Sequence, residues 1–215
     1  MADRTFAIAG VILASGMSQR MGTAKQFLPY KGMPLLEHAI RKLLPLPFAQ
    51  IFAVVGKQHQ ARLAEIPIDD PRFRWVLNER NHEGQSAALQ CAAECGKDCA
   101  GIMVFLADQP LLLPDTIRRV YDTAVEQLAR GGERFVVQPA YADVRGHPVF
   151  FARGLLASFA MLEGDEGGKR VIKQAAAHHV IPVDDAGVLF DIDTPEDYQR
   201  LLQMSAGVAK GGEGE

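Results

Sequence analysis

The sequence predicts an α/β fold in a single domain, a three-layer sandwich with helices on both faces of a mostly parallel sheet. Short apolar runs typical of buried strands alternate along the chain with segments of helical periodicity, and this alternation is typical of parallel sheets. The length of 215 residues suits one large domain better than two and is enough to bury a substantial core.

The first half of the chain supplies most of the predicted elements. Apolar or β-branched runs bounded by turn residues predict strands at residues 7–14, 51–55, 74–77 and 101–106. Apolar residues at helical spacing predict helices at residues 34–44, 57–66 and 87–95. Pro45 and Pro47 should end the first of these helices, since the residue before a proline disfavours helical backbone.

The second half is less regular. It contains a helical pattern at 116–128, a strand at 135–138 and an apparent strand that opens with His178 and His179. The run Thr194-Pro195-Glu196-Asp197 predicts a helix start, because threonine caps, proline fits the first position and acids favour the positive end. We expect the folded domain to span residues 1–204, and the Gly-rich tail at 205–215 to be disordered because it lacks apolar periodicity.

The loop after the first strand has the composition of a phosphate-binding turn. It holds Ser15, Gly16 and Ser18, together with the cations Arg20 and Lys25. Glycine lets the backbone approach a ligand and point N–H groups at it, while arginine and lysine supply complementary charge for phosphate oxygens. The glycine spacing fits neither the dinucleotide-binding G-x-G-x-x-G pattern nor the Walker P-loop.

Acidic residues lie in two other predicted turns. Asp108 comes directly after the apolar strand at 101–106, and Asp191 and Asp193 lie in a strand-to-helix turn where alternation would put both on the same side. In a parallel sheet, ligands gather at the carboxyl ends of the strands. A hard cation such as Mg²⁺ needs one or two carboxylates plus substrate phosphate oxygens, so Asp108 with Asp191 or Asp193 would suffice.

The opening motif resembles the signature of a nucleotidyltransferase family. The run L-A-S-G-M-S-Q-R-M-G-T-A-K-Q-F-L, followed by G-M-P-L-L-E, is similar to the pattern of the enzymes related to molybdenum cofactor guanylyl- and cytidylyltransferases. Ser15 stands where that family usually has alanine or glycine. The resemblance covers about the first 200 residues and implies a Rossmann-like sandwich of the nucleotide-diphospho-sugar transferase type.

The resemblance also implies roles for single residues. It implies that Asp108 is the metal-binding aspartate and that D-I-D-T-P-x-D is the closing acidic motif; we favour Asp191 over Asp193 as the second ligand. The implied catalytic residues are Arg20, Lys25 and Asp108. The implied nucleotide contacts are Leu13, Ala14, Ser15, Gly16, Ser18, Arg20, Lys25, Asn78, Gly84, Gln85 and Ser86. Of these, the segment from Asn78 to Ser86 resembles the family loop that meets the base and ribose.

Two further segments resemble parts of the cytidylyltransferase branch and would face the second substrate. They are G-H-P-V-F-F and G-D-E-G-G-K-R, and the expected acceptor contacts are His147, Asp165, Gly167 and Arg170. The usual form of the second segment has G-A-R, from which Gly168-Lys169 departs, so the acceptor stays open at this point.

The activity that the resemblance implies is transfer of a nucleotide, most readily CMP from CTP, to the phosphate of molybdopterin with release of pyrophosphate. Mg²⁺ is the expected cofactor, with Mn²⁺ as a substitute, and a molybdoenzyme that receives the product is a further candidate partner. The alternatives are a guanylyltransferase, a sugar- or alditol-phosphate nucleotidyltransferase, a non-catalytic pterin carrier or chaperone, and a nicotinamide-dependent redox protein that reuses the fold.

Composition excludes several other classes. The net charge of −3 does not support a nucleic-acid-binding face, and no apolar run is long enough to span a membrane. The N-terminus lacks the pattern of a secretory signal, so we expect a cytoplasmic protein. Cys91, Cys95 and Cys99 lack metal-site spacing and are expected to pack against the sheet.

Overall fold

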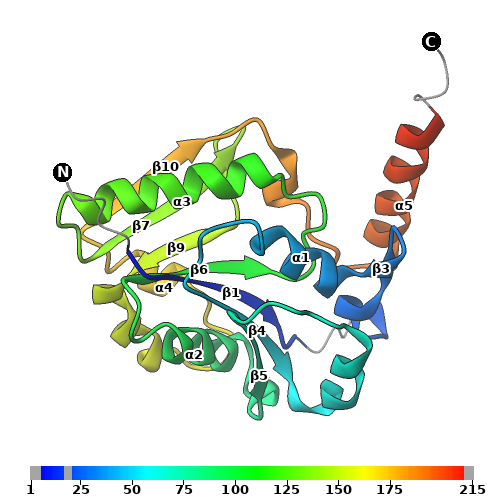
Figure 1. The fold of residues 1–215 in the computed structure, drawn as a ribbon, viewed down its shortest axis with the longest axis horizontal. Helices are drawn as coiled ribbons and strands as arrows, with labels where there is room; N and C mark the ends of the chain where they lie inside the picture. The colour runs from blue at the N-terminus through cyan, green and yellow to red at the C-terminus, as the bar shows by residue number, and fades with distance from the viewer. Residues whose placement is uncertain (1–5, 17–20, 211–215) are drawn as a thin grey trace.

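The sheet is the organising element of the computed structural model, which describes residues 6–16 and 21–210 (Figure 1). Its strands are β1 (Ile8–Ala14), β4 (Gln50–Gly56), β5 (Phe73–Asn78), β6 (Gly101–Leu106), β7 (Phe135–Tyr141), β8 (Val144–Arg145), β9 (Val149–Ala152) and β10 (Ala177–Pro182). The order is β10-β7-β9-β6-β1-β4-β5, with β8 paired to β7. Strands β1, β4, β5 and β6 run parallel to one another, as does β10 to β7, whereas β9 is antiparallel to both of its neighbours.

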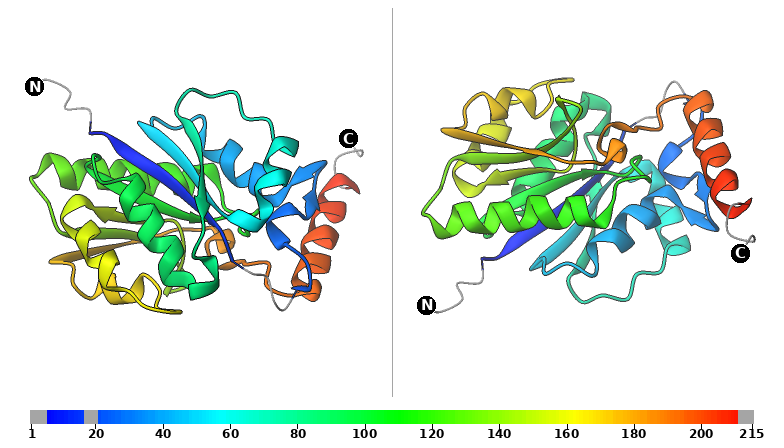
Figure 2. Two further views of the ribbon diagram at one scale, coloured as in Figure 1. Left: turned by 90° about the horizontal axis from the view of Figure 1, so that it is seen from below. Right: turned by 90° about the horizontal axis from the view of Figure 1, so that it is seen from above.

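The helices α1 (Leu35–Leu43), α2 (Gln85–Cys95), α3 (Pro114–Ala129) and α4 (Lys169–Ile172) cover the two faces of this sheet. A further helix, α5 (Pro195–Lys210), lies at the end of the molecule (Figure 1). The 3₁₀ segments are η2 (Lys25–Phe27), η3 (Lys57–Glu65), η4 (Asn81–Glu83), η5 (Arg153–Met161) and η6 (Ala186–Leu189), and a small hairpin joins β2 (Pro29–Tyr30) to β3 (Met33–Pro34). Figure 2 shows α1 and α3 over one face and α2 over the other.

Side-chain alternation in β1 divides the core into two layers. Ile8 and Ile12 pack with the apolar faces of α1 and α3, while Ala9 and Val11 pack with α2, η5 and α4. A third, smaller cluster joins Leu201 of α5 to the β2–β3 hairpin, at the end of the molecule where α5 stands in Figure 1. These layers confirm the predicted α/β sandwich with a mostly parallel sheet.

Two sequence-based expectations are corrected by the backbone. The segment at 57–66 forms a 3₁₀ helix rather than an α-helix. Asp191 and Asp193 lie in irregular backbone between η6 and α5, so strand alternation does not govern them. Helix α5 spans Pro195–Lys210 and so extends past residue 204, the end that we expected for the folded domain.

The cysteines pack as expected. Cys91 and Cys95 lie on α2, which ends at Cys95, so Cys99 lies beyond the helix. All three are free, and Cys99 and Cys91 belong to the layer between α2 and the sheet. Burial raises the pKa of the Cys95 thiol to about 12, which leaves it protonated and unreactive at neutral pH. No helix in the described part of the chain is both long and apolar enough to cross a bilayer.

Candidate active site

A cleft of about 800 Å³ opens at the carboxyl ends of β1 and β6. These two strands are neighbours in the sheet, and Leu13 pairs with Leu106, so the segments that follow both strands emerge side by side. Many of the residues expected to bind substrate or metal line this cleft: Leu13, Ala14, Ser15, Gly16, Lys25, Gly84, Gln85, Asp108, Asp165, Asp191 and Asp193.

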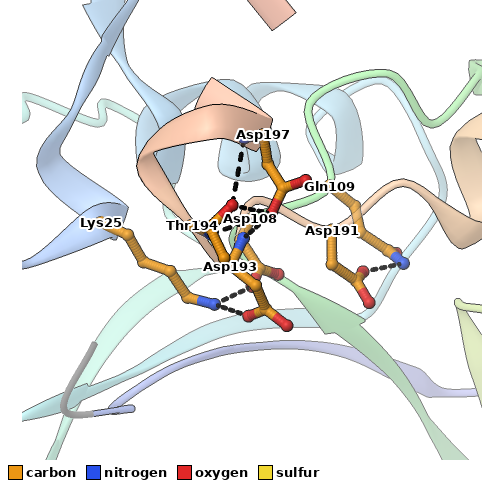
Figure 3. A network of polar contacts seen from close by, with 7 residues as sticks. All are labelled: Lys25, Asp108, Gln109, Asp191, Asp193, Thr194 and Asp197. Atoms are coloured by element: carbon orange, nitrogen blue, oxygen red, sulfur yellow. Dashed lines mark hydrogen bonds and ion pairs between the residues drawn. The ribbon is translucent and has the colours of Figure 1, made fainter. Parts of the chain in front are cut away.

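Lys25 joins two of the expected metal ligands (Figure 3). Its ammonium nitrogen lies 2.5 Å from Asp108 Oδ2 and 2.8 Å from Asp193 Oδ1. Burial opposes the charged form of Lys25, but the two carboxylates, Asp108 above all, outweigh it and raise the pKa of the ammonium. Lys25 therefore stays positively charged at neutral pH, as a group that binds phosphate must.

Asp191 has a different partner. Its Oδ1 accepts a hydrogen bond of 2.8 Å from Nε2 of Gln109, the residue that follows Asp108 in the chain. Asp191 lines the cleft and is open to solvent there. Desolvation by the protein atoms around its carboxyl group, together with the nearby charge of Asp108, raises the pKa of Asp191 to about 6.

The start of α5 is capped as the sequence predicted. Thr194 Oγ1 accepts a hydrogen bond from the backbone N–H of Asp197, and Asp197 Oδ2 accepts one from the backbone N–H of Thr194. This reciprocal arrangement is a capping box with aspartate in the acidic position. The side chain of Asp193 takes no part in the cap, because it is directed to Lys25.

A divalent cation suits the chemistry of this donor set. Asp108, Asp191 and Asp193 line one cleft, where desolvation and, after it, the charges of Asp108 and Asp193 disfavour the ionised form of Asp191; a bound cation would relieve both effects. Among the described residues, no group of three or more histidine, cysteine, aspartate or glutamate side chains is arranged so that it could already hold a metal ion. Lys25 holds Asp108 and Asp193 in their present positions.

The opposite wall of the cleft is built from the segment that precedes α2. Gly84 has a φ of +102°, and a Cβ there would lie 2.5 Å from the carbonyl oxygen of Gly164, so only glycine fits. The backbone N–H of Ser86 donates to that same carbonyl at 3.0 Å. The segments 84–86 and 164–165 are thus joined, and Asp165 reaches the cleft beside Gly84.

Asn78 and Ser86, both expected to contact the nucleotide, are buried behind the cleft surface. Asn78 donates to Ser15 Oγ at 3.3 Å and accepts the backbone N–H of Arg80 at 3.0 Å. It therefore connects the loop after β1 to the loop after β5. Ser18 and Arg20 lie outside the described residues.

The expected acceptor contacts are not gathered in one place. Asp165 lines the cleft, and Gly167 lies against it, because a Cβ on Gly167 would come within 2.9 Å of Gln85 Oε1. Arg170 is exposed and pairs with Glu166 instead. His147 donates its backbone N–H to Val188 O at 3.1 Å and does not line the cleft. Burial lowers the pKa of its imidazole to about 4, which keeps the ring neutral at pH 7.

Sequence reasoning did not single out several lining residues. They are Gln26, Ala88, Leu106 and Ala107, together with Asn81, His82 and Glu83, which lie inside the segment 78–86 that the resemblance assigns to the nucleotide. Gln26 is the most informative of them: it is 2% exposed, and its Nε2 has no hydrogen-bond acceptor among the described residues. A buried donor beside the cleft is costly unless a ligand accepts its hydrogen bond. Its signal in the sequence was its place in the opening motif, directly after Lys25.

Comparison with known proteins agrees with this geometry. The model of the MobA-like NTP transferase domain matches residues 10–180. The chain belongs to the MobA-like NTP transferase domain family. This confirms the family suggested by the opening motif, and the protein is an enzyme of the nucleotidyltransferase class.

Relatives of this MobA-like transferase carry different names. The purine catabolism protein PucB of Bacillus subtilis (strain 168) is 33% identical, over 90% of this chain and 95% of PucB. The nicotine blue oxidoreductase of Paenarthrobacter nicotinovorans is 28% identical, over 91% of this chain and 96% of that protein. The molybdenum cofactor cytidylyltransferase of Escherichia coli (strain K12) is 23% identical, over 89% of this chain and 94% of that protein.

Solved structures share the fold over nearly the whole chain. Rv0371c from Mycobacterium tuberculosis H37Rv, in a complex with manganese, superposes with a TM-score of 0.74 at 28% identity, covering 93% of this chain and 99% of that one. A protein of the same fold was therefore solved with bound manganese, which is consistent with the donor set described above.

Proposed function

We propose that this MobA-like transferase moves CMP from CTP to the phosphate of a molybdopterin-type cofactor. In this reaction an oxygen of the acceptor phosphate forms a bond to the α-phosphorus of CTP. The bond between the α-phosphorus and its bridging oxygen breaks, and pyrophosphate leaves. A phosphate acceptor is already ionised at neutral pH, so the protein need not supply a general base.

The observation that carries this proposal is the charged group at one end of the cleft. Lys25, Asp108, Asp191 and Asp193 converge beside Ser15 and Gly16, in a cleft of about 800 Å³, which falls within the usual size of small-molecule sites. Phosphoryl and nucleotidyl transfer depend on in-line positioning and charge neutralisation rather than on covalent participation of the protein. The cleft supplies both cationic and anionic groups for that purpose.

Each residue then has a definite task. Lys25, together with Arg20, would bind the β- and γ-phosphates and stabilise the departing pyrophosphate. Asp108 and Asp191 would hold Mg²⁺, or Mn²⁺ in its place, with Asp193 as the third candidate ligand. The bound cation would neutralise phosphate charge. Gln26 would donate its unused hydrogen bond to the nucleotide.

The remaining walls would bind the base and the acceptor. The segment from Asn81 to Gln85 lines the cleft on the side expected for base and ribose. Asp165 and Gly167 adjoin that segment through the contacts of Gly84 and Gln85, which would bring the acceptor next to the nucleotide. A relative named molybdenum cofactor cytidylyltransferase, from E. coli, supports the choice of CTP and of a molybdopterin-type acceptor. A molybdoenzyme that accepts the product would complete the pathway.

One alternative is favoured by a specific observation. A relative named nicotine blue oxidoreductase shares 28% identity over almost the full length, so a redox role on this fold is the second candidate. The described cleft argues for a triphosphate instead, because a nicotinamide cofactor does not require a lysine held between two carboxylates. The same feature argues against a non-catalytic pterin carrier.

Pyrophosphate release tests the proposal. The protein would be incubated with Mg²⁺ or Mn²⁺, each of the four nucleoside triphosphates in turn, and a molybdopterin-type acceptor. Release with CTP that depends on the acceptor supports the cytidylyltransferase. Release with GTP, or with a sugar or alditol phosphate as acceptor, retains the chemistry and changes the substrate. No release with any triphosphate refutes the proposal, and pterin binding without release favours the carrier.

A further inference from the structure

A second hollow lies away from the nucleotide cleft, between the C-terminal half of α1 and the N-terminal turn of α3. We call it the α1–α3 recess. Its volume is about 440 Å³, within the range of sites for small molecules. The apolar part of its wall comes from Met33, Pro45, Leu46 and Pro114, and none of these residues lines the nucleotide cleft.

The charge of the recess is opposite to that of the whole protein. Arg41, Lys42 and Arg118 line it against a single carboxylate, Asp115, whereas the chain carries a net charge of −3. Arg41 also pairs with Glu37 at 2.7 Å, which leaves Lys42 and Arg118 as the cations with no ion pair to a carboxylate among the described residues. Burial lowers the pKa of the remaining basic group, His38, so its ring adds no charge at neutral pH.

Lys42 occupies the inner wall of the recess. Its ammonium donates to the carbonyl oxygen of Pro110 at 2.5 Å and approaches that of Gln109 at 3.5 Å. An ammonium has three hydrogens, so one remains for a ligand in the recess. Gln109 and Pro110 directly follow Asp108, and the recess and the cleft therefore lie on either side of one short segment.

We propose that the α1–α3 recess is a second ligand site, which binds a small phosphate monoester with an apolar body. The phosphate would lie between Lys42 and Arg118, where charge-assisted hydrogen bonds are available, and the apolar body would cover Met33 and Leu46. This inference does not depend on which nucleotide or acceptor the cleft uses, because it rests on different residues.

Methyl NMR of the full chain tests the site with phenyl phosphate as the probe. The protein would carry ¹³C-methyl methionine, and the Met33 resonance, assigned with Met33→Leu, reports on the recess. We expect a saturable shift of that resonance with a Kd in the millimolar range or tighter, as expected for a ligand of about eleven non-hydrogen atoms. Phenol, which has the same ring without the charge, should leave the resonance nearly unmoved.

Charge reversal supplies the matched variants. Arg118→Glu should weaken binding about tenfold or more, because it replaces an attractive charge beside the phosphate with a repulsive one. Arg119→Glu changes the adjacent exposed position of α3, which does not line the recess, and should bind as the unmodified protein does. An unmoved Met33 resonance, equal binding by the two variants, or an equal response to phenol would overturn the proposal.

Discussion

The side-chain amide of Gln109 donates a hydrogen bond of 2.8 Å to Oδ1 of Asp191. Its second amide hydrogen goes to the carbonyl oxygen of Val188 at 3.0 Å. Both hydrogens of Nε2 are therefore used, which fixes the orientation of the amide and directs a donor at Asp191. Because Gln109 follows Asp108 in the chain, this one contact ties together two acidic residues that are far apart in the sequence.

Gln109→Leu should weaken metal binding while preserving the fold. Leucine keeps the approximate volume, and Val188 O retains the N–H of His147, but Asp191 loses the donor that orients it. Loss of a group that supports a metal ligand typically costs ten- to a hundredfold in affinity, about 1.4–2.7 kcal/mol. The measurement is an Mn²⁺ titration followed by electron paramagnetic resonance. Gln203→Leu, on the exposed face of α5, is the control and should bind Mn²⁺ normally.

Lys25→Ala should lower turnover about a hundredfold to a thousandfold, because the substituted cleft lacks a cation for the departing pyrophosphate. The assay is pyrophosphate release at saturating nucleotide. Lys57→Ala removes a lysine of similar charge whose partner, Glu79, is on the surface, and it should leave the rate unchanged. Equal rates for the two variants would contradict the role given to Lys25.

Asp108→Ala should fold with a normal circular dichroism spectrum and lose turnover by about a thousandfold, since the proposed cation site loses a ligand. The affinity for Mn²⁺ should fall together with the turnover of this variant, which would show that the activity is lost because the metal is lost. Near-native turnover in well-folded Asp108→Ala would refute the metal assignment.

The stability of the metal-free protein should fall as pH rises through the range in which Asp191 titrates. The pKa of Asp191 is about 6 in the folded protein and 3.8 in the reference state, so between these values the folded chain retains a proton that the unfolded chain has lost. Ionisation of Asp191 as the pH rises through this range therefore lowers the free energy of unfolding. Asp191→Asn removes the effect, and its free energy of unfolding should exceed that of the unmodified protein at pH 7 but not at pH 4.

Urea unfolding at several pH values, with a chelator present, measures this difference. Comparing the free energies of unfolding of the two proteins at each pH cancels the contributions of the titrating groups that behave alike in both. Saturating Mn²⁺ should reverse the advantage of the variant at pH 7, because a cation stabilises the ionised carboxylate. A stability difference that stays constant with pH would contradict the assignment.

Gly84→Ala should destabilise the protein more than Gly131→Ala does. Both glycines have positive φ, +102° and +83°, so each alanine carries backbone strain of about 1 kcal/mol. A Cβ at Gly131 meets nothing within 4 Å, whereas one at Gly84 must displace the carbonyl of Gly164. We expect an additional cost of about 1–2 kcal/mol from that displacement, measured by urea unfolding. Only Gly84→Ala should also weaken nucleotide binding.

Much of the fold follows from local patterns in the sequence. The runs that became β1, β4 and β6 are almost wholly apolar, as buried parallel strands require, and β5 keeps a β-branched and aromatic centre. Strand β9 was missed because it is only Val149–Ala152, and nothing local shows that it runs antiparallel between β6 and β7. The segment containing it was recognised for its resemblance to an acceptor loop instead.

The site could be predicted only in part. Lys25 and Asp108 were identifiable because each follows an apolar strand, but their 2.5 Å contact depends on β1 and β6 being neighbours, which no local pattern reveals. The same limitation applies to Lys25 and Asp193, which are joined only when α5 closes against the β2–β3 hairpin. Gln26 stands inside the opening motif and His82 inside the segment 78–86, but neither has a side chain that the motif singles out, and their part in the cleft comes from how the loops fold.

The contact between Gly84 and Gly164 has a consequence for how substrate preference can change. The Ser86 N–H and the space left by the missing Gly84 side chain both depend on the position of one carbonyl, so a change in the backbone of one segment should displace the other. The wall proposed to bind the base and its neighbour should therefore change together. A graft of residues 81–86 from a guanylyltransferase that alters this backbone contact should need the partner segment 163–168 from the same donor.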